Sequence, residues 1–453
     1  MPRTLSIARA RITVALCLAL FALALSLPAA AAPTFTILHT FSGVGADGAQ
    51  PQGGLLQDIA GKIHGETQLG GLNGVGTDWV MSSSGSTFNT LYNFGATAID
   101  GQAPTGGLRN LVGDAEVTGI DFGVAQSGGS FGLGTVFIAD QLGNEITIHN
   151  FTGGTDGGVP VGRLLPWVDG SYYGTAADGG QYGYGTVFRI AGNGSFKVLH
   201  AFNLSDGANP LGGLQYGNDG NFYGSTVGGG KFNEGVVYKI SPTGSFSVIY
   251  NFTGGTDGGG PQEALATDFH GNLYGTTSLG GTGRVGTIFR VNQWGSFTTL
   301  YTFPTASDGT NPKGSTPLAS LTLSTIDCDR DLFTTPAQVR RLIWQRATGR
   351  AFTFGGSAPV VLYGSTTSGG NATNSGVIFS FNVSTKTYTI LYAFSGSDGA
   401  VPDGKLLASF DGNLYGTTTA GGANGVGVVF KIGGVLSSAA PLRGTFQGIH
   451  RIH

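Results

Sequence analysis

Seven aspartates recur in one motif, Asp-Gly-x-x-Pro, and are the first candidates for chemistry in this chain. They are Asp47, Asp100, Asp156, Asp206, Asp257, Asp308 and Asp398. If all copies share one face of the fold, their carboxylates would form a ring that could bind Ca²⁺ or the hydroxyl groups of a glycan. The alternative is structural: the aspartate bonds a backbone amide two residues on, glycine takes an unusual φ, and proline begins a strand. Recurrence in every repeat favours this structural interpretation.

Residues that depart from the repeat are the second kind of candidate. His64 and Glu66 replace a tyrosine and a threonine, and their spacing of two points both side chains to the same face of a strand. They are weak catalytic candidates, because drift between repeats explains them as well. Other acids outside the repeat pattern are Glu116, Asp121 and Glu263, which share no spacing.

Other metal and catalytic patterns are weaker. His39, His149 and His200 occupy the position that tyrosine holds in the aromatic strands of other repeats, so packing explains them better than metal binding does. The segment 327–331 resembles the start of a calcium loop, but Leu332 stands where the loop needs glycine and Gln338 where it needs glutamate. No Gly-x-Ser-x-Gly, His-Glu-x-x-His or phosphate-loop motif occurs.

Each repeat of about 50 residues contains four predicted strands. In the fourth copy they are Leu211–Tyr216, Asn221–Thr226, Gly235–Ile240 and Ser245–Phe252. Asp-Gly and Pro-x-Gly turns separate the strands, as expected for antiparallel hairpins. Four antiparallel strands per repeat are the content of one propeller blade.

The two ends of the repeat region predict a closed ring. The region opens with a lone fourth strand, Phe35–Phe41, and ends with a blade that lacks its fourth strand. Joining these fragments completes one blade and hides two sheet edges. We therefore predict an all-β, seven-bladed β-propeller that is closed when the N-terminal strand pairs into the last blade.

The chain divides into a leader, a propeller and a tail. Residues 1–32 combine three arginines, a short apolar run and an Ala-x-Ala site, which is typical of a secretory signal peptide. The propeller is expected at 33–434, with an insert at about 322–359 in blade six, and a flexible tail at 435–453. The insert holds the only expected helix, at 337–347, and is either a cap over one face or a reading-frame artefact.

Composition limits the possible partners. Without the leader, 20 basic residues face 26 acidic ones, so no basic surface favours nucleic acid. Cys328 would be the only remaining cysteine, which excludes an internal disulfide. No membrane span is expected in the mature chain, which we expect to be a monomer. The 82 glycines sit at regular turn positions, as in a β-protein.

The repeat resembles the GloVer (Gloeo/Verruco) tandem repeat of exported bacterial proteins. The best matches are Tyr274–Thr277 with Gly280 and Gly281, and Tyr415–Thr418 with Gly421 and Gly422. The resemblance covers roughly residues 35–432 apart from the insert. It implies an extracellular or cell-surface location, with the periplasm as a further possibility, and it implies no activity for particular residues.

Two functions follow from these observations. The first is a non-enzymatic, exported binding module for an extracellular, glycan-like polymer or a protein partner. The alternative is a propeller hydrolase or lyase that acts on a carbohydrate or lactone. Propellers host both classes. We favour binding, because an enzyme needs unique acids and bases that converge, whereas most acids here follow the repeat.

Overall fold

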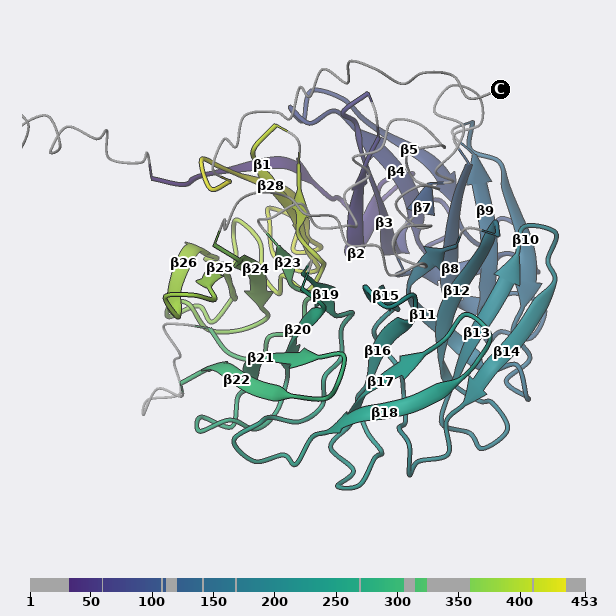
Figure 1. Ribbon diagram of the computed structural model, residues 1–453. Coiled ribbons are helices and arrows are strands. Elements are labelled where there is room, and N and C mark those ends of the chain that lie inside the picture. Colours follow the sequence, from purple (N-terminus) through teal and green to yellow (C-terminus); the bar gives the residue numbers. More distant parts are fainter. Residues whose placement is uncertain are drawn as a thin grey trace, which may run out of the picture.

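The chain forms a ring of seven small antiparallel sheets around a central axis (Figure 1). The computed structural model describes residues 32–58, 60–106, 109–110, 120–140, 142–167, 169–268, 270–304, 314–323, 359–409 and 411–436. Within these residues every regular element is a β-strand. The predicted all-β, seven-bladed propeller is therefore confirmed.

The first three blades carry the longest inner strands. Blade one comprises β2 (Gly48–Gln57), β3 (Ile63–Gly70), β4 (Thr77–Met81) and β5 (Phe88–Asn93). Blade two comprises β6 (Gly101–Pro104), β7 (Arg109–Asn110), β8 (Ile120–Gly128), β9 (Thr135–Asp140) and β10 (Glu145–Asn150). Blade three comprises β11 (Gly158–Pro166), β12 (Ser171–Asp178), β13 (Thr186–Ala191) and β14 (Phe196–Ala201).

Blades four to six begin with two-residue inner strands. Blade four comprises β15 (Gln215–Tyr216), β16 (Phe222–Thr226), β17 (Val236–Ile240) and β18 (Phe246–Asn251). Blade five comprises β19 (Ala266–Thr267), β20 (Asn272–Thr277), β21 (Thr287–Asn292) and β22 (Phe297–Thr302). Blade six comprises β23 (Thr322–Leu323), β24 (Val361–Thr366), β25 (Val377–Asn382) and β26 (Thr387–Ala393). In each blade the first strand lies toward the axis and the fourth at the rim (Figure 1).

The seventh blade joins the two ends of the propeller. Its strands are β27 (Leu407–Ala408), β28 (Leu414–Thr418), β29 (Val428–Gly433) and β1 (Thr34–Thr40). β1 pairs antiparallel with β29, from Thr34 opposite Gly433 to Thr40 opposite Val428. The predicted closure by the N-terminal strand is thus confirmed.

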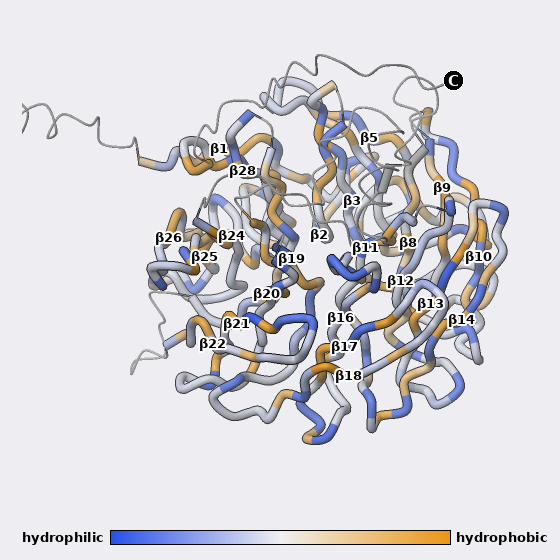
Figure 2. The backbone as a smooth tube through the Cα atoms, viewed as in Figure 1, coloured by the Kyte–Doolittle hydropathy of each residue, from blue (hydrophilic) through white to orange (hydrophobic). Residues whose placement is uncertain are grey.

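The hydrophobic core lies between neighbouring blades. One phenylalanine just after each fourth strand is fully buried: Phe41, Phe94, Phe151, Phe202, Phe252, Phe303 and Phe394. Apolar stretches recur in the strands of each blade, whereas many connecting loops are polar or neutral (Figure 2). Because each apolar cluster combines residues of adjacent blades, no blade can bury its faces alone.

A glycine of each blade packs against a proline of the next. A Cβ on that glycine would lie under 3.0 Å from the proline Cδ, so only glycine permits the approach. The seven pairs are Gly76 and Pro104, Gly134 and Pro160, Gly185 and Pro210, Gly235 and Pro261, Gly286 and Pro317, Gly376 and Pro402, and Gly427 and Pro51. The last pair links blade seven to blade one, so the contact runs around the whole ring.

The residue before each of these prolines has a left-handed backbone. Val159 and Val401 have φ values of 52° and 56°, which β-branched residues rarely adopt. The Val159 amide donates to the Leu133 carbonyl of the preceding blade at 2.8 Å, and the other six copies make the same bond. The inter-blade hydrogen bond therefore holds the strained residue in place.

The sixth motif differs from its assignment by sequence. Asp308 lies outside the described residues, but the glycine and proline of this copy are Gly314 and Pro317. A Cβ on Gly314 would collide with Thr366, as one on Gly48 would with Thr67. The sixth copy of the motif therefore spans 313–317, five residues after the sequence match at 308–312. In this copy the sequence has Lys313 at the position that aspartate holds in the other copies.

Blade six includes the first two residues of the segment predicted as an insert at about 322–359. β23 extends to Leu323 and pairs with β24. The predicted signal peptide up to residue 31, the helix of the insert and the tail from residue 437 lie outside the described residues. The described residues contain no helix with the length and apolar character that a membrane crossing needs.

Replacing Gly427 by alanine tests the contact that closes the ring. A Cβ there would meet the Thr418 carbonyl and Pro51, at a φ of +104°. We expect Gly427→Ala to lower the free energy of unfolding by roughly 3–5 kcal/mol, the combined cost of left-handed backbone and overpacking. Gly425→Ala is the matched control, because Gly425 has a φ of +77° and nothing within 4 Å. Chemical denaturation measures both, and equal losses would contradict the role of the contact.

Candidate functional site

The six described aspartates of the motif are bound within their own turns. Each accepts a hydrogen bond of 2.7–3.0 Å from an amide three to five residues earlier. The prediction that each aspartate binds an amide two residues later in the sequence is therefore wrong, because the donor amide precedes the aspartate. The turn interpretation itself fits, because the carboxylate closes the loop that leads from one blade to the next.

The same carboxylates also contact the histidine or tyrosine of the preceding fourth strand. The pairs lie 2.6–3.3 Å apart: His39 and Asp47, Tyr92 and Asp100, His149 and Asp156, His200 and Asp206, Tyr250 and Asp257, and Tyr392 and Asp398. Burial alone would raise the pKa of Asp47, but hydrogen bonds from His39 and Ser42 outweigh it and hold the pKa below its ordinary value. Each of these pairs is thus confined to one blade junction.

The described residues contain no group of three or more His, Cys, Asp or Glu side chains that could hold a metal ion. The three fourth-strand histidines each face an aspartate of their own repeat instead of converging. The described aspartates of the motif instead accept the hydrogen bonds that close their loops.

His64 keeps the contact of the tyrosine that it replaces. Its Nε2 lies 3.2 Å from Asp58 Oδ2. In blade five the tyrosine hydroxyl donates to the equivalent aspartate, from Tyr274 to Asp268 at 2.9 Å, and in blade four Tyr223 donates to Asp219 of the same turn at 2.8 Å. The substitution therefore preserves a structural bond.

Glu66 lies inside blade one rather than at the axis. It is buried and pairs across the ladder with buried Asp78, which stands where other blades have valine or isoleucine. Neither side chain lines the central cavity. Of the other unpatterned acids, Glu116 and the side chain of Asp121 lie outside the described part of the chain, whereas Glu263 reaches the axis.

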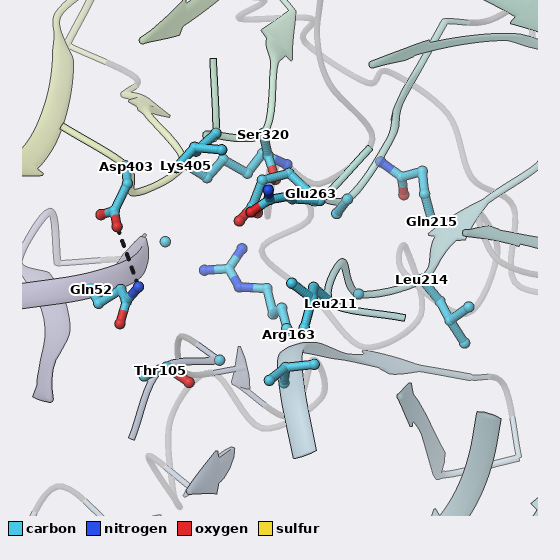
Figure 3. Close-up of a pocket in the computed structure, with 18 of the residues that line it drawn as sticks. Gln52, Thr105, Arg163, Leu211, Leu214, Gln215, Glu263, Ser320, Asp403 and Lys405 are labelled. Carbon is cyan, nitrogen blue, oxygen red and sulfur yellow. Dashed lines mark hydrogen bonds between the residues drawn. The ribbon is translucent and has the colours of Figure 1, made fainter. Parts of the chain in front are cut away.

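The central channel holds a polar cavity of about 230 Å³. Residues of all seven blades line it, and all of them except Gln126 lie one to five positions after a motif proline. Its charged side chains are Arg163, Glu263, Asp403 and Lys405, and its uncharged polar side chains include Gln52, Gln262 and Ser320. Figure 3 shows the Arg163 guanidinium and the Glu263 carboxyl pointing into this space.

Hydrogen bonds between blades orient these side chains. Gln52 Nε2 donates to Asp403 Oδ2 at 3.3 Å, which joins blades one and seven (Figure 3). Ser320 Oγ donates to Glu263 Oε2 at 3.0 Å. Arg163 Nη2 donates to the Leu55 carbonyl at 3.1 Å and so spans from blade three to blade one. The cavity is therefore built across the ring rather than within any single blade.

The two acids of the cavity differ in their pKa values. Burial raises the pKa of Glu263 to about 8, which the charge of Asp403 reinforces and the Ser320 hydrogen bond opposes. Burial raises the pKa of Asp403 to about 6, against the hydrogen bond from Gln52. Near neutral pH the site thus offers a protonated carboxyl, a carboxylate and two cationic groups.

Sequence reasoning found Glu263 but missed the other three charged residues. The missed signal lies in the three positions after each motif proline, which place Arg163, Asp403 and Lys405 in the cavity lining. Those positions differ between repeats, as in Gln52, Asp403 and Lys405. The repeat conserves the proline and leaves these neighbours free to vary.

The Gloeobacter/Verrucomicrobia repeat model matches residues 164–324 and 352–447, more than half of the chain. The chain belongs to this family. The predicted family membership is confirmed, and the matched ranges include the sixth copy on both sides of the insert.

Two solved structures are similar at low identity. An oligogalacturonate lyase from Vibrio parahaemolyticus is 12% identical with a TM-score of 0.49, over 88% of this chain and 93% of that one. The extracellular domain of a hybrid two-component system from B. thetaiotaomicron is 13% identical with a TM-score of 0.48, over 90% of this chain and 44% of that one. No curated protein matches this chain. Similarity at this level assigns no function.

One blade junction breaks the aromatic pattern of the other six. In six junctions the fourth-strand histidine or tyrosine stacks on a ring of the next blade, with centroids 3.7–4.6 Å apart. Between blades one and two, Glu145 takes the place of that ring, beside Tyr92 and Asp100. Burial, and then the charge of Asp100, raise the pKa of Glu145 to about 8.

Glu145 makes the stability of this junction depend on pH. Its pKa is raised on folding from about 4.5 to about 8, so its contribution is complete below pH 4.5 and is lost as the pH rises to 8. We expect the melting temperature of Glu145→Gln to fall less between pH 5 and pH 9 than that of the wild type. Glu145→Phe, which restores a ring against Tyr92, should show the same flatter profile with a higher melting temperature. Parallel profiles for all three proteins would refute this role.

Proposed function

We propose that the protein is an exported, non-enzymatic binding module that takes part of an extracellular glycan into its central cavity. The observation that carries the proposal is the convergence of Arg163, Glu263, Asp403 and Lys405 from different blades. The aspartates of the repeat, by contrast, already serve the turns. Recognition of a ligand requires different functional groups that meet at one place, whereas the construction of a repeat does not require them.

The chemistry of the cavity suits a sugar. Sugar hydroxyl groups both donate and accept hydrogen bonds, and the cavity presents amides, a hydroxyl, carboxyl groups and cations within a small space. Its volume of about 230 Å³ lies below the roughly 300–1,000 Å³ of sites for drug-sized ligands. A single sugar unit fits that volume better than a folded segment of a protein partner does. The N-terminal leader supports export, and membership of the repeat family is in keeping with it.

Variants of the cavity test this proposal. A hydrogen bond from a charged group contributes about 1.5–3 kcal/mol, so Arg163→Met should weaken binding of a glycan identified on an array about 10-fold to 100-fold. Asp403→Asn should weaken it in the same direction. Arg189→Met is the matched control, because Arg189 is ion-paired with Asp169 at 2.9 Å outside the cavity. Calorimetric titration measures affinity, and melting temperatures report folding. Unchanged affinity in both cavity variants would reject the proposal.

A second candidate function is hydrolysis or elimination on a carbohydrate or lactone. One observation favours it: the cavity pairs a carboxyl of pKa about 8 with one of pKa about 6, as a general acid and a general base would require. The charge of Asp403 also contributes to the raised pKa of Glu263.

A turnover assay separates binding from catalysis. We expect the wild-type protein to release no reducing ends, unsaturated products or opened lactone from the ligands that it binds, and Glu263→Gln to behave identically. Turnover by the wild type with a pH profile shaped by groups near 6 and 8, together with its loss in Glu263→Gln, would establish the enzyme instead.

A further inference from the structure

Three aromatic side chains project into solvent from successive blades. Phe131, Tyr182 and Phe232 are 60%, 52% and 48% exposed. Each stands two residues after a Gly-Gly pair, in the loops between β8 and β9, β12 and β13, and β16 and β17 (Figure 1). We call these three residues the aromatic arc. Because each loop joins the second and third strands of its blade, all three rings lie on the same face of the propeller.

The fold does not need rings at this position. In three other blades the loop carries an asparagine whose Nδ2 donates to a carbonyl of the buried phenylalanine behind it. These bonds run from Asn73 to Phe94, Asn371 to Phe394 and Asn424 to Phe41, at 2.8–2.9 Å. At the position of Asn73 and Asn424, each arc residue has an aromatic ring in place of the asparagine that stabilises the blade. That ring leaves apolar surface in water. Repetition of this costly change in three neighbouring blades points to a ligand.

Hydrogen bonds fix the backbone of the loops that carry the rings. The amide of Ser130 donates to Asn150 Oδ1 and that of Lys231 to Asn251 Oδ1, both at 2.8 Å. The second glycine of each pair donates to the neighbouring inter-blade loop, as from Gly129 to the Asp100 carbonyl at 2.8 Å. A preorganised loop backbone loses little conformational entropy on binding.

We propose that the aromatic arc stacks against sugar rings of a glycan chain that runs across blades two to four. Aromatic faces carry negative charge density and attract the polarised C–H groups on the flat faces of β-linked pyranoses. The rings are interrupted by Gly, Ser, Gln and Asn residues, so they form separate stacking points rather than the continuous apolar patch of a protein interface. Lys231, 5.2 Å from the Phe232 ring centroid, adds a cation beside the path.

The arc lies on the same face as the mouth of the channel at which the cavity residues begin. The cavity residues follow directly after the motif prolines, and the motif segments bond to the same Gly-Gly loops. The arc therefore extends the binding surface outward from the axis. The proposal rests on the proposed function only in taking the ligand to be a glycan; it does not require the cavity to be occupied.

Retardation in native gels tests the arc. We expect full-length mature protein to be retarded in gels that contain hydroxyethylcellulose, a neutral β-linked polymer, more than in gels with dextran, which is α-linked. The triple variant Phe131→Ala, Tyr182→Ala, Phe232→Ala should lose at least tenfold in affinity, whereas Tyr182→Phe alone should bind as the wild type because the ring is kept. The matched control replaces Leu142 and Trp294 by alanine; these are 88% and 76% exposed in turns on the opposite face.

Comparison with Arg163→Met separates the arc from the cavity. Loss of retardation in the triple variant but not in Arg163→Met supports the arc and rejects the cavity as the glycan site. The reverse result rejects the arc alone. Absence of retardation by hydroxyethylcellulose, or an equal loss in the Leu142 and Trp294 control, rejects the arc as well. A wild-type protein that self-associates in light scattering, with a monomeric triple variant, would make the arc a contact between copies and overturn the proposal.

Discussion

The close approach of a glycine in one blade to a proline in the next is the contact on which the rest of the structure depends. It occurs seven times, and its last instance, Gly427 against Pro51, makes the chain a ring. The residue before each proline is held in a left-handed conformation by a bond to the preceding blade. This combination fixes the chain at the start of each blade, and the residues that follow the proline line the axis.

The same constraint separates structural residues from those free to acquire a function. Aspartates of the motif close their loops and pair with His or Tyr, so a substitution there would disturb a blade junction. The residues just after the proline take no part in closing these loops. They differ between blades and bring Arg163, Glu263 and Asp403 together in a low-dielectric cavity, where burial shifts the pKa values of the two acids upward.

Much of the fold could be predicted from the sequence, because turn chemistry and strand alternation act locally and recur seven times. The fragments at the two ends of the propeller also predicted the closure by β1, since unpaired edges are unfavourable. The candidate site was predicted poorly. Asp308 matched the motif letter by letter, yet Pro317 makes the sixth contact, because packing against Gly286 selects the register. His64 looked unusual but preserves the bond of a tyrosine.

By itself, the sequence determined the repeat, its four strands, the number of blades and the family to which the chain belongs. Only the tertiary structure decided that Asp-Gly-x-x-Pro is the scaffold of the site rather than the site, because the partners of each aspartate lie across a loop and a blade junction. It also decided which variable residues meet. Gln52 and Asp403 are separated by almost the whole propeller in sequence, and only closure of the ring places them 3.3 Å apart.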